Sequence, residues 1–206
     1  MRGLLAVRCF ASCAWCALAF LIVGDVAGNE PGRWRTFGER VIYESPEVWF
    51  GQVDVSLPSR ERFWQHVLRL HRAVAVALLD GHGGVLLVRR YRVVQDRWGW
   101  ELPGGLVDDD EEPDEAAVRE LEAQTGYAAG QLERLIVFQP VAEIVDGEGV
   151  VFAGRGPQHL GEPVNAEGID RAEWIPLASV GELIASGDVW NGSSVIGLLS
   201  VLAQLR

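Results

Sequence analysis

Residues 101–127 read ELPGGLVDDDEEPDEAAVRELEAQTGY, and this stretch decides the fold. A glycine pair opens it, an acidic run follows, and a segment of helical character closes it. Pro113 suits the first turn of a helix, and Gly126 suits the position just after the last turn. Ala117 and Leu121 lie four residues apart and form the apolar stripe that such a helix buries. The stretch therefore predicts a loop followed by a helix that runs from Pro113 to Gly126.

The spacing within this stretch resembles the Nudix box of diphosphate hydrolases. The family pattern is G-x5-E-x7-R-E-U-x-E-E-x-G-U, in which U is a bulky apolar residue. Tyr127 is acceptable at the last position, but Ala123 and Gln124 stand where the family has two glutamates. The resemblance implies an α/β fold, a Nudix-type α/β/α sandwich with mixed sheets. The matching positions are Gly105, Glu111, Arg119, Glu120, Leu121 and Gly126, and the structural box residues among them are Gly105, Glu111, Arg119 and Gly126.

The geometry of a helix explains why acids recur at these box positions. Successive residues turn by about 100°, so positions 120, 123 and 124 project to one side. Only Glu120 is an acid there, because Glu122 points about 160° away from it. Gln124 offers a neutral amide oxygen. We therefore expect a divalent ion, Mg²⁺ or Mn²⁺, to bind more weakly than at a site with two or three carboxylates.

The resemblance also implies where further oxygen ligands come from. In related ADP-ribose hydrolases the backbone carbonyl before the box glycine is a ligand, so the predicted metal ligands are Gly104, Glu120 and Gln124. A glutamate from a later loop often takes part, and the candidates are Glu143, Asp146 and Glu148. The predicted catalytic residues are Glu120, Glu143 and Glu148. The family role of Arg119 is to support the helix and loop by pairing with Glu111 or an upstream carboxylate.

Two segments before the box indicate a diphosphate ligand. Residues 87–92 read LVRRYR and residues 100–105 read WELPGG. They resemble the Q-Y-R and W-E-L-P-A-G segments of the ADP-ribose and nucleoside-diphosphate-sugar branch, with Arg90 in place of glutamine. A guanidinium can bond two oxygens of a diphosphate at once. The predicted substrate-binding residues are Arg92, Arg90, Trp100 and Glu101.

Length and composition limit the class of protein and its partners. The chain has 206 residues, is 49% hydrophobic and carries a formal net charge of −11. This size allows a sizeable core, and the acidic balance argues against nucleic acid as a partner. The expected partner is a small-molecule nucleotide substrate. The resemblance further implies a homodimer in which N-terminal strands help to build the partner's site.

Residues 1–28 differ in character from the rest of the chain. Arg2 and Arg8 precede a mainly apolar stretch, which has the shape of a signal peptide and is short for a membrane span. An exported leader, a membrane anchor and a start assigned too far upstream all fit. We expect a cytoplasmic protein, with a membrane partner only if the leader is retained. The predicted division is residues 1–28 as leader, 29–69 as N-terminal linker and strands, and 70–206 as Nudix domain.

Hydrophobic periodicity outside the box predicts mainly short strands and two further helices. The helices are expected at Leu177–Ser186 and at Ser193–Leu205, the second with Ser193 or Asn191 as its N-cap. Loops are expected at residues 91–104 and 143–149. The predicted strands are Val41–Glu44, Val48–Val55, Phe63–Leu70, Ala73–Leu79, Val85–Arg89, Leu135–Phe138, Val150–Ala153 and Ala172–Ile175.

Two classes of function fit these features. The first is a metal-dependent hydrolase that cleaves the diphosphate of a nucleoside diphosphate linked to another group, such as ADP-ribose or a nucleotide sugar. The second is a catalytically inactive Nudix-fold module that binds a nucleotide or a protein. The loss of two box acids motivates the second class. Turnover of a nucleotide substrate by the natural chain would exclude it.

Overall fold

The computed structural model describes residues 32–58, 60–165 and 168–204. The predicted leader and the first residues of the linker lie outside this part of the chain. Among the described residues, no helix combines the length and the apolar character needed to cross a membrane. The strands are β1 (Arg35–Glu44), β2 (Val48–Leu57), β3 (Arg60–Leu70), β4 (Ala73–Leu79), β5 (Gly84–Arg92), β6 (Arg97–Glu101), β7 (Gly104–Leu106), β8 (Tyr127–Phe138), β9 (Val145–Asp146), β10 (Gly149–His159) and β11 (Ile169–Pro176), and the helices are α2 (Pro113–Thr125), α3 (Leu177–Ser186) and α4 (Gly192–Gln204).

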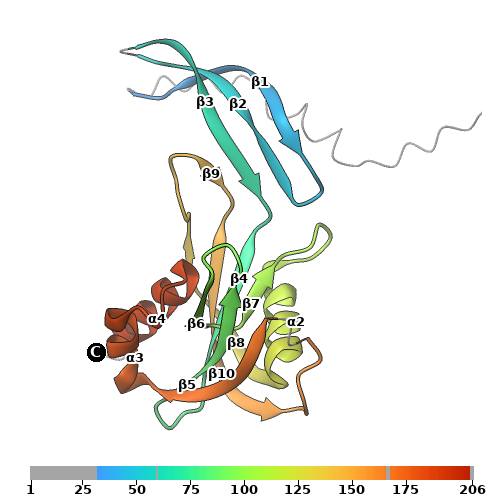
Figure 1. The fold of residues 1–206 in the computed structure, drawn as a ribbon, viewed down its shortest axis with the longest axis vertical. Helices are drawn as coiled ribbons and strands as arrows, with labels where there is room; N and C mark the ends of the chain where they lie inside the picture. Colours follow the sequence, from blue (N-terminus) through green and yellow to red (C-terminus); the bar gives the residue numbers. More distant parts are fainter. Residues whose placement is uncertain (1–31, 59, 166–167, 205–206) are drawn as a thin grey trace, which may run out of the picture.

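A mixed seven-stranded sheet forms the body of the molecule. Its main order is β11-β5-β4-β10-β8, with β6 added beside β5 and β7 beside β4. Strands β4 and β10 run parallel, and their other neighbours run antiparallel. Helix α2 covers one face, and α3 with α4 covers the other (Figure 1). This arrangement is the α/β/α sandwich that the box predicted.

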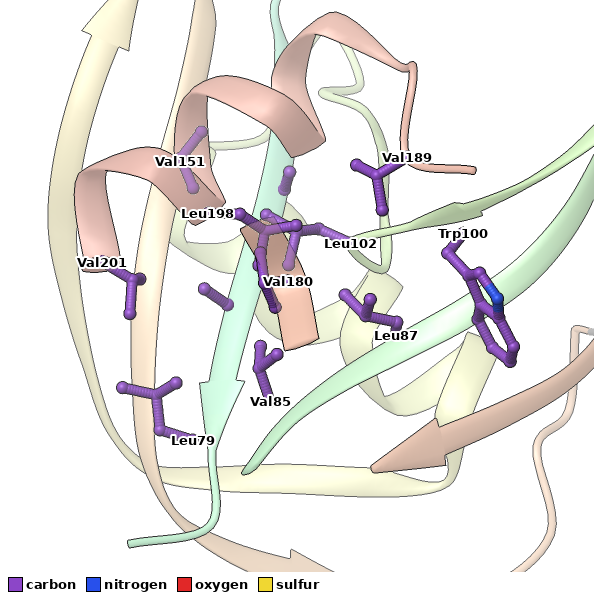
Figure 2. Packing of buried hydrophobic residues seen from close by; sticks show 12 residues of the cluster. Leu79, Val85, Leu87, Trp100, Leu102, Val151, Val180, Val189, Leu198 and Val201 are labelled. Carbon is purple, nitrogen blue, oxygen red and sulfur yellow. The ribbon is translucent and has the colours of Figure 1, made fainter. Parts of the chain in front are cut away.

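Strand β4 supplies both layers of the core because its side chains alternate between the two faces. Val76 and Leu78 pack with Leu121 of α2. Ala77 and Leu79 pack on the opposite face with residues of α3 and α4 (Figure 2). All of these side chains are buried. The nearly continuous apolar run of β4 therefore reflects burial on both faces.

A second sheet of four strands extends away from this body. Its order is β1-β2-β3-β9, and β9 joins through parallel pairing with β3. The three long strands rise beyond the helices (Figure 1). Strand β1 is exposed along its whole length. The predicted linker therefore becomes a strand from Arg35 onward, paired with β2.

The structure confirms the predicted helices and changes several strands. Helix α2 ends at Gly126, whose φ of 69° is the left-handed conformation that glycine favours. The expected loop at 91–104 contains β6, and the expected loop at 143–149 contains β9. Strands β8 and β10 are longer than predicted because they also pair with each other through segments of small and polar residues. Apolar periodicity cannot detect strand segments whose side chains face solvent.

The N-cap of α4 was left open between two residues, and the structure selects Asn191. Its side-chain oxygen accepts a bond from the Ser194 N–H at 3.2 Å. We expect Asn191→Ala to lower the free energy of unfolding by about 1 kcal/mol, because the helix loses a cap. We expect Ser193→Ala to change it by less than about 0.5 kcal/mol. Urea unfolding of both variants measures this difference, and equal effects would contradict the assignment.

Candidate active site

A cleft of about 430 Å³ opens at the end of the larger sheet. The loop before α2, strand β5 and the first turn of α4 all contribute to its lining. The lining is mainly polar around two arginines, and the positive end of the α4 dipole favours an anion. The cleft is therefore suited to a phosphate group. The lining residues that carry the argument are Arg90, Arg92, Glu101, Gly104, Gln124 and Ser193.

Strand β7 brings the box glycines against the sheet and against α2. Gly104 pairs with Ala75, and Gly105 pairs with Val74. A Cβ at Gly104 would lie 2.1 Å from the Val74 carbonyl oxygen, and one at Gly105 would lie 2.5 Å from the Glu120 carboxyl group. Real Cβ atoms do not approach other atoms so closely. Both glycines therefore let the backbone lie directly on the box helix and β4.

Arg119 ties the acidic loop to the helix. Its guanidinium donates to the two oxygens of Glu111 at 2.8 and 2.7 Å and to the Leu106 carbonyl at 3.0 Å. It also donates to Glu120 at 2.6 Å. These bonds raise the pKa of Arg119 far above its ordinary range. The structure thus shows the predicted pairing of Arg119 with Glu111, which fixes the loop that carries the box glycines.

The same ion pair predicts a dependence of stability on pH. The hydrogen bond from Arg119 holds the pKa of Glu111 below its ordinary value of 4.5. A lowered pKa means that the carboxylate stabilises the native state at neutral pH and loses this contribution as pH falls below 4.5. We expect Glu111→Gln to lower the free energy of unfolding by up to about 1 kcal/mol near neutral pH, because the pair is partly exposed.

Urea unfolding of the wild type and Glu111→Gln at about pH 7 and about pH 3 checks this expectation. The difference between the two proteins should shrink at the lower pH. A difference that grows toward acid would show that the carboxylate does not act through its ionised form.

Gln124 is buried, and both the oxygen and the nitrogen of its side-chain amide form hydrogen bonds. Its Oε1 accepts from the Gly104 N–H at 3.1 Å, and its Nε2 donates to the Gly104 carbonyl at 2.9 Å. The same Nε2 donates to Glu120 at 2.6 Å. Glu120 itself is 13% exposed at its side chain and lies behind this amide rather than on the cleft wall. The predicted metal ligands Gly104, Glu120 and Gln124 thus come together, joined by hydrogen bonds among themselves.

The two arginines of the cleft have different surroundings. Arg92 forms a two-fold pair with Glu101, with Nε to Oε1 at 2.9 Å and Nη2 to Oε2 at 2.5 Å. Arg90 is only 8% exposed, and its Nε has no partner within the described structure. Burial lowers the pKa of Arg90, as does repulsion by Arg92, while Glu101 and Glu120 favour its charged form. Arg90 is therefore a buried cation available to an anion in the cleft.

The structure places the other predicted site residues outside the cleft lining. Glu143 and Glu148 lie in the connection between β8 and β10, where their carbonyl oxygens bond Gln65 and Ala73. Trp100 is buried at one edge of the core cluster that also contains residues of α3 and α4 (Figure 2). The roles that the sequence suggested for these three residues stay predictions.

Sequence reasoning missed the contribution of α4 and of the segment before β11. Ser194 is buried, and its hydroxyl accepts from the Leu102 N–H at 2.9 Å. Asn165 lines the cleft, and its N–H bonds the Ala123 carbonyl at 2.8 Å. No motif marks these positions. The only sequence signal was the N-cap pattern that starts α4.

The structure is an α/β/α sandwich with a polar cleft, lined by two arginines, beside a loop-helix box. The NUDIX domain model matches residues 69–195, and the chain belongs to the Nudix family. It is a Nudix-type diphosphate hydrolase. Members of this family generally use divalent metals and act on small-molecule nucleotides.

Relatives support the same branch of the family. The chain is 38% identical over 170 residues to CMP-5'-(N-acetyl-N-hydroxy-3-aminopropyl)phosphonate hydrolase of Streptomyces rubellomurinus, covering 82% of each chain. It is 29% identical to ADP-ribose pyrophosphatase of Mycobacterium tuberculosis, covering 72% of this chain and 73% of that protein. The crystal structure of an ADP compounds hydrolase has a TM-score of 0.71 at 20% identity, covers 85% of this chain and 96% of its own, and shows the shared fold.

The residues at the box do not fit a metal held by several carboxylates. Both oxygens of Glu120 accept bonds from Arg119 and Gln124. The Gly104 carbonyl accepts from Gln124. In the described part of the chain, no group of three or more histidine, cysteine, aspartate or glutamate side chains could hold an ion. The neutral amide of Gln124 therefore changes the character of this site.

Proposed function

We propose that the protein hydrolyses the diphosphate of a nucleoside diphosphate linked to another group, of the ADP-ribose or nucleotide-sugar kind. The single observation that carries this proposal is the buried, incompletely partnered Arg90 in a polar cleft of a Nudix fold. A buried guanidinium favours an anionic ligand that can bond it. The names of the relatives support a nucleotide with two phosphorus groups.

Each of the four predicted substrate-binding residues has a role in the proposed function. Arg90 and Arg92 bind the phosphate oxygens, and the first turn of α4 adds backbone N–H groups through its positive end. Glu101 holds Arg92 in place through their two-fold pair. Trp100 supports strand β6, which carries Glu101. These contacts hold the substrate with its phosphorus atoms beside the box.

The reaction adds one water across a P–O–P link. The water oxygen bonds to one phosphorus, the bridging P–O bond breaks, and the electron pair stays on the bridging oxygen. The products are a nucleoside monophosphate and a second phosphate ester. The attacking water loses one proton, which a proposed catalytic carboxylate accepts and passes to solvent. Glu120, Glu143 and Glu148 remain the proposed catalytic residues. Mg²⁺ or Mn²⁺ is the proposed cofactor, and when bound it would neutralise phosphate charge.

A panel of nucleotides tests the proposal. The panel contains ADP-ribose, a nucleotide sugar, a CMP-linked phosphonate and ATP, each with Mg²⁺ or Mn²⁺. We expect release of a nucleoside monophosphate from at least one of the first three compounds, faster than any release from ATP. Absence of product from all of them, with folded protein at high concentration, would refute the proposal. The comparisons give no support to the alternative of an inactive module.

We also propose that the protein is a cytoplasmic homodimer. The supporting observation is the sheet of β1, β2 and β3, which extends from the body and exposes large apolar side chains. Such a patch on a soluble protein marks an interaction surface. Light scattering that gives the mass of one chain at micromolar concentration would refute the dimer. The exposed large apolar residues of these strands are Phe37, Val41, Ile42, Tyr43, Trp64 and Leu70.

A further inference from the structure

At one point in the box, two oxygens from different residues meet one amide nitrogen. Gln124 Nε2 lies 2.9 Å from the Gly104 carbonyl oxygen and 2.6 Å from a Glu120 oxygen. A side-chain amide has two N–H donors, and each is used here. The amide nitrogen thus lies between these two oxygens, in the position that a cation would take if both oxygens bound it.

The Gly104 backbone fixes which way this amide points. Its N–H donates to Gln124 Oε1 at 3.1 Å. Turning the amide over would set its NH₂ group against that N–H and its oxygen against the two acceptors. All three hydrogen bonds would be lost in a buried place, where unpaired polar groups are costly. The oxygen of Gln124 is therefore held away from the point between Gly104 and Glu120.

A glutamate of the same length would behave in the opposite way. One oxygen would keep the bond from the Gly104 N–H, and the other would take the place of Nε2. Three oxygens would then converge with no donor between them, which is an arrangement that binds a hard divalent ion. The exchange of one NH₂ group for an oxygen thus decides between a hydrogen-bonded site and a metal site.

Arg90 adds positive charge at the same point. Its Nη1 lies 3.4 Å from the Gly104 carbonyl oxygen, which also accepts a hydrogen bond from Gln124. The guanidinium is buried and incompletely partnered. Arg119 donates directly to Glu120 at 2.6 Å, so the charges of Arg119 and Arg90 together offset that of Glu120 without an added ion.

We propose that the Gln124 amide and the Arg90 guanidinium replace a protein-bound divalent ion between Gly104 and Glu120. Any divalent ion that the reaction uses then arrives on the phosphates of the substrate, a consequence that rests on the proposed function. The replacement itself rests only on the hydrogen bonds and burial described above. It can therefore be tested without substrate.

The experiment measures Mn²⁺ binding to the full chain by electron paramagnetic resonance, with no nucleotide present. The proteins are the wild type, Gln124→Glu, Glu120→Gln and the double variant. We expect Gln124→Glu to bind Mn²⁺ at least about tenfold more tightly than the wild type. The double variant should lose this gain, and Glu120→Gln alone should bind as the wild type does. Glu122→Gln is the matched control, because its side chain points away from this place.

Thermal unfolding tests the same proposal in a second way. Gln124→Glu should melt below the wild type in chelator, because its oxygens repel, and Mn²⁺ should raise its melting temperature more than that of the wild type. Wild-type Mn²⁺ binding that disappears in Glu120→Gln would overturn the proposal, and this comparison does not depend on the folding of Gln124→Glu. A folded Gln124→Glu that gains no affinity would also overturn it. Neither readout uses turnover, so failure here is distinct from failure of the proposed hydrolysis.

Discussion

Replacement of Arg90 by glutamine should lower kcat/KM for a diphosphate nucleotide by about 100- to 1,000-fold. Preorganised donors in a dry site contribute this much when they meet developing phosphate charge. Arg90 is 8% exposed and lies beside Gly104 in the cleft. Glutamine keeps a hydrogen-bonding side chain but removes the charge, so the loss reports the charge rather than a cavity.

The neighbouring arginine supplies the control for this prediction. Arg89 precedes Arg90 on β5 and lies on the other face of the strand, near the rings of Trp98 and Trp100. Arg89→Gln should leave kcat/KM within a few-fold of the wild type. Steady-state kinetics of both variants, with melting curves to show that they fold, separates the two positions. Equal losses would mean that the cleft does not use the charge of Arg90.

Replacement of Arg92 by leucine should lower the free energy of unfolding by about 3 kcal/mol. The side chain of Glu101 is 2% exposed, whereas that of Arg92 is 39% exposed. Removal of the arginine leaves a buried carboxylate without its two-fold partner, and this uncompensated charge dominates the cost. The reverse change, Glu101→Leu, leaves an arginine that can reach water and should cost less.

A double-mutant cycle checks this prediction by urea unfolding. Arg92→Leu combined with Glu101→Leu should recover much of the stability lost in Arg92→Leu alone, because the buried carboxylate that lacks its partner is removed as well. If the two single changes have additive effects on the free energy of unfolding, the ion pair of Arg92 and Glu101 does not determine the stability of this end of the sheet. Arg92→Leu should also weaken substrate binding, which kinetics would show separately.

The sequence predicted the helix of the box because its signals are local. Pro113, Gly126 and the four-residue spacing of Ala117 and Leu121 all act within one element. The same holds for α3, whose predicted bounds match the structure. By contrast, β9 has two residues and depends on pairing with β3, far along the chain. Strand β6 has five residues and pairs with the preceding strand β5. Segments this short carry little pattern of their own.

The site shows the same division between local and distant causes. Helical spacing correctly brought Glu120 and Gln124 together, and the structure gives a direct bond between them. The use of the Gln124 amide could not be predicted, because it depends on the Gly104 backbone, which β4 positions. The pair of Arg92 and Glu101 likewise depends on the register of β5 and β6.

The structure shows what Gln124, in place of a box glutamate, does at this site. Gln124 is a fully bonded buried residue that holds the loop, the helix and Glu120 in one arrangement. The loss of a glutamate there therefore leaves an ordered site. In the proposed function, Arg90 and Arg92 of the same cleft supply the positive charge that binds a phosphate.

In the proposed reaction, the protein adds water across a P–O–P link. Hydrolysis of ADP-ribose, or of the best compound in the panel, in ¹⁸O-labelled water tests it most directly. Mass spectrometry of the products should find one ¹⁸O atom per turnover, in the phosphate group of one product, because water attacks phosphorus. Label on a sugar carbon, or no labelled product from folded protein at high concentration, would contradict the account.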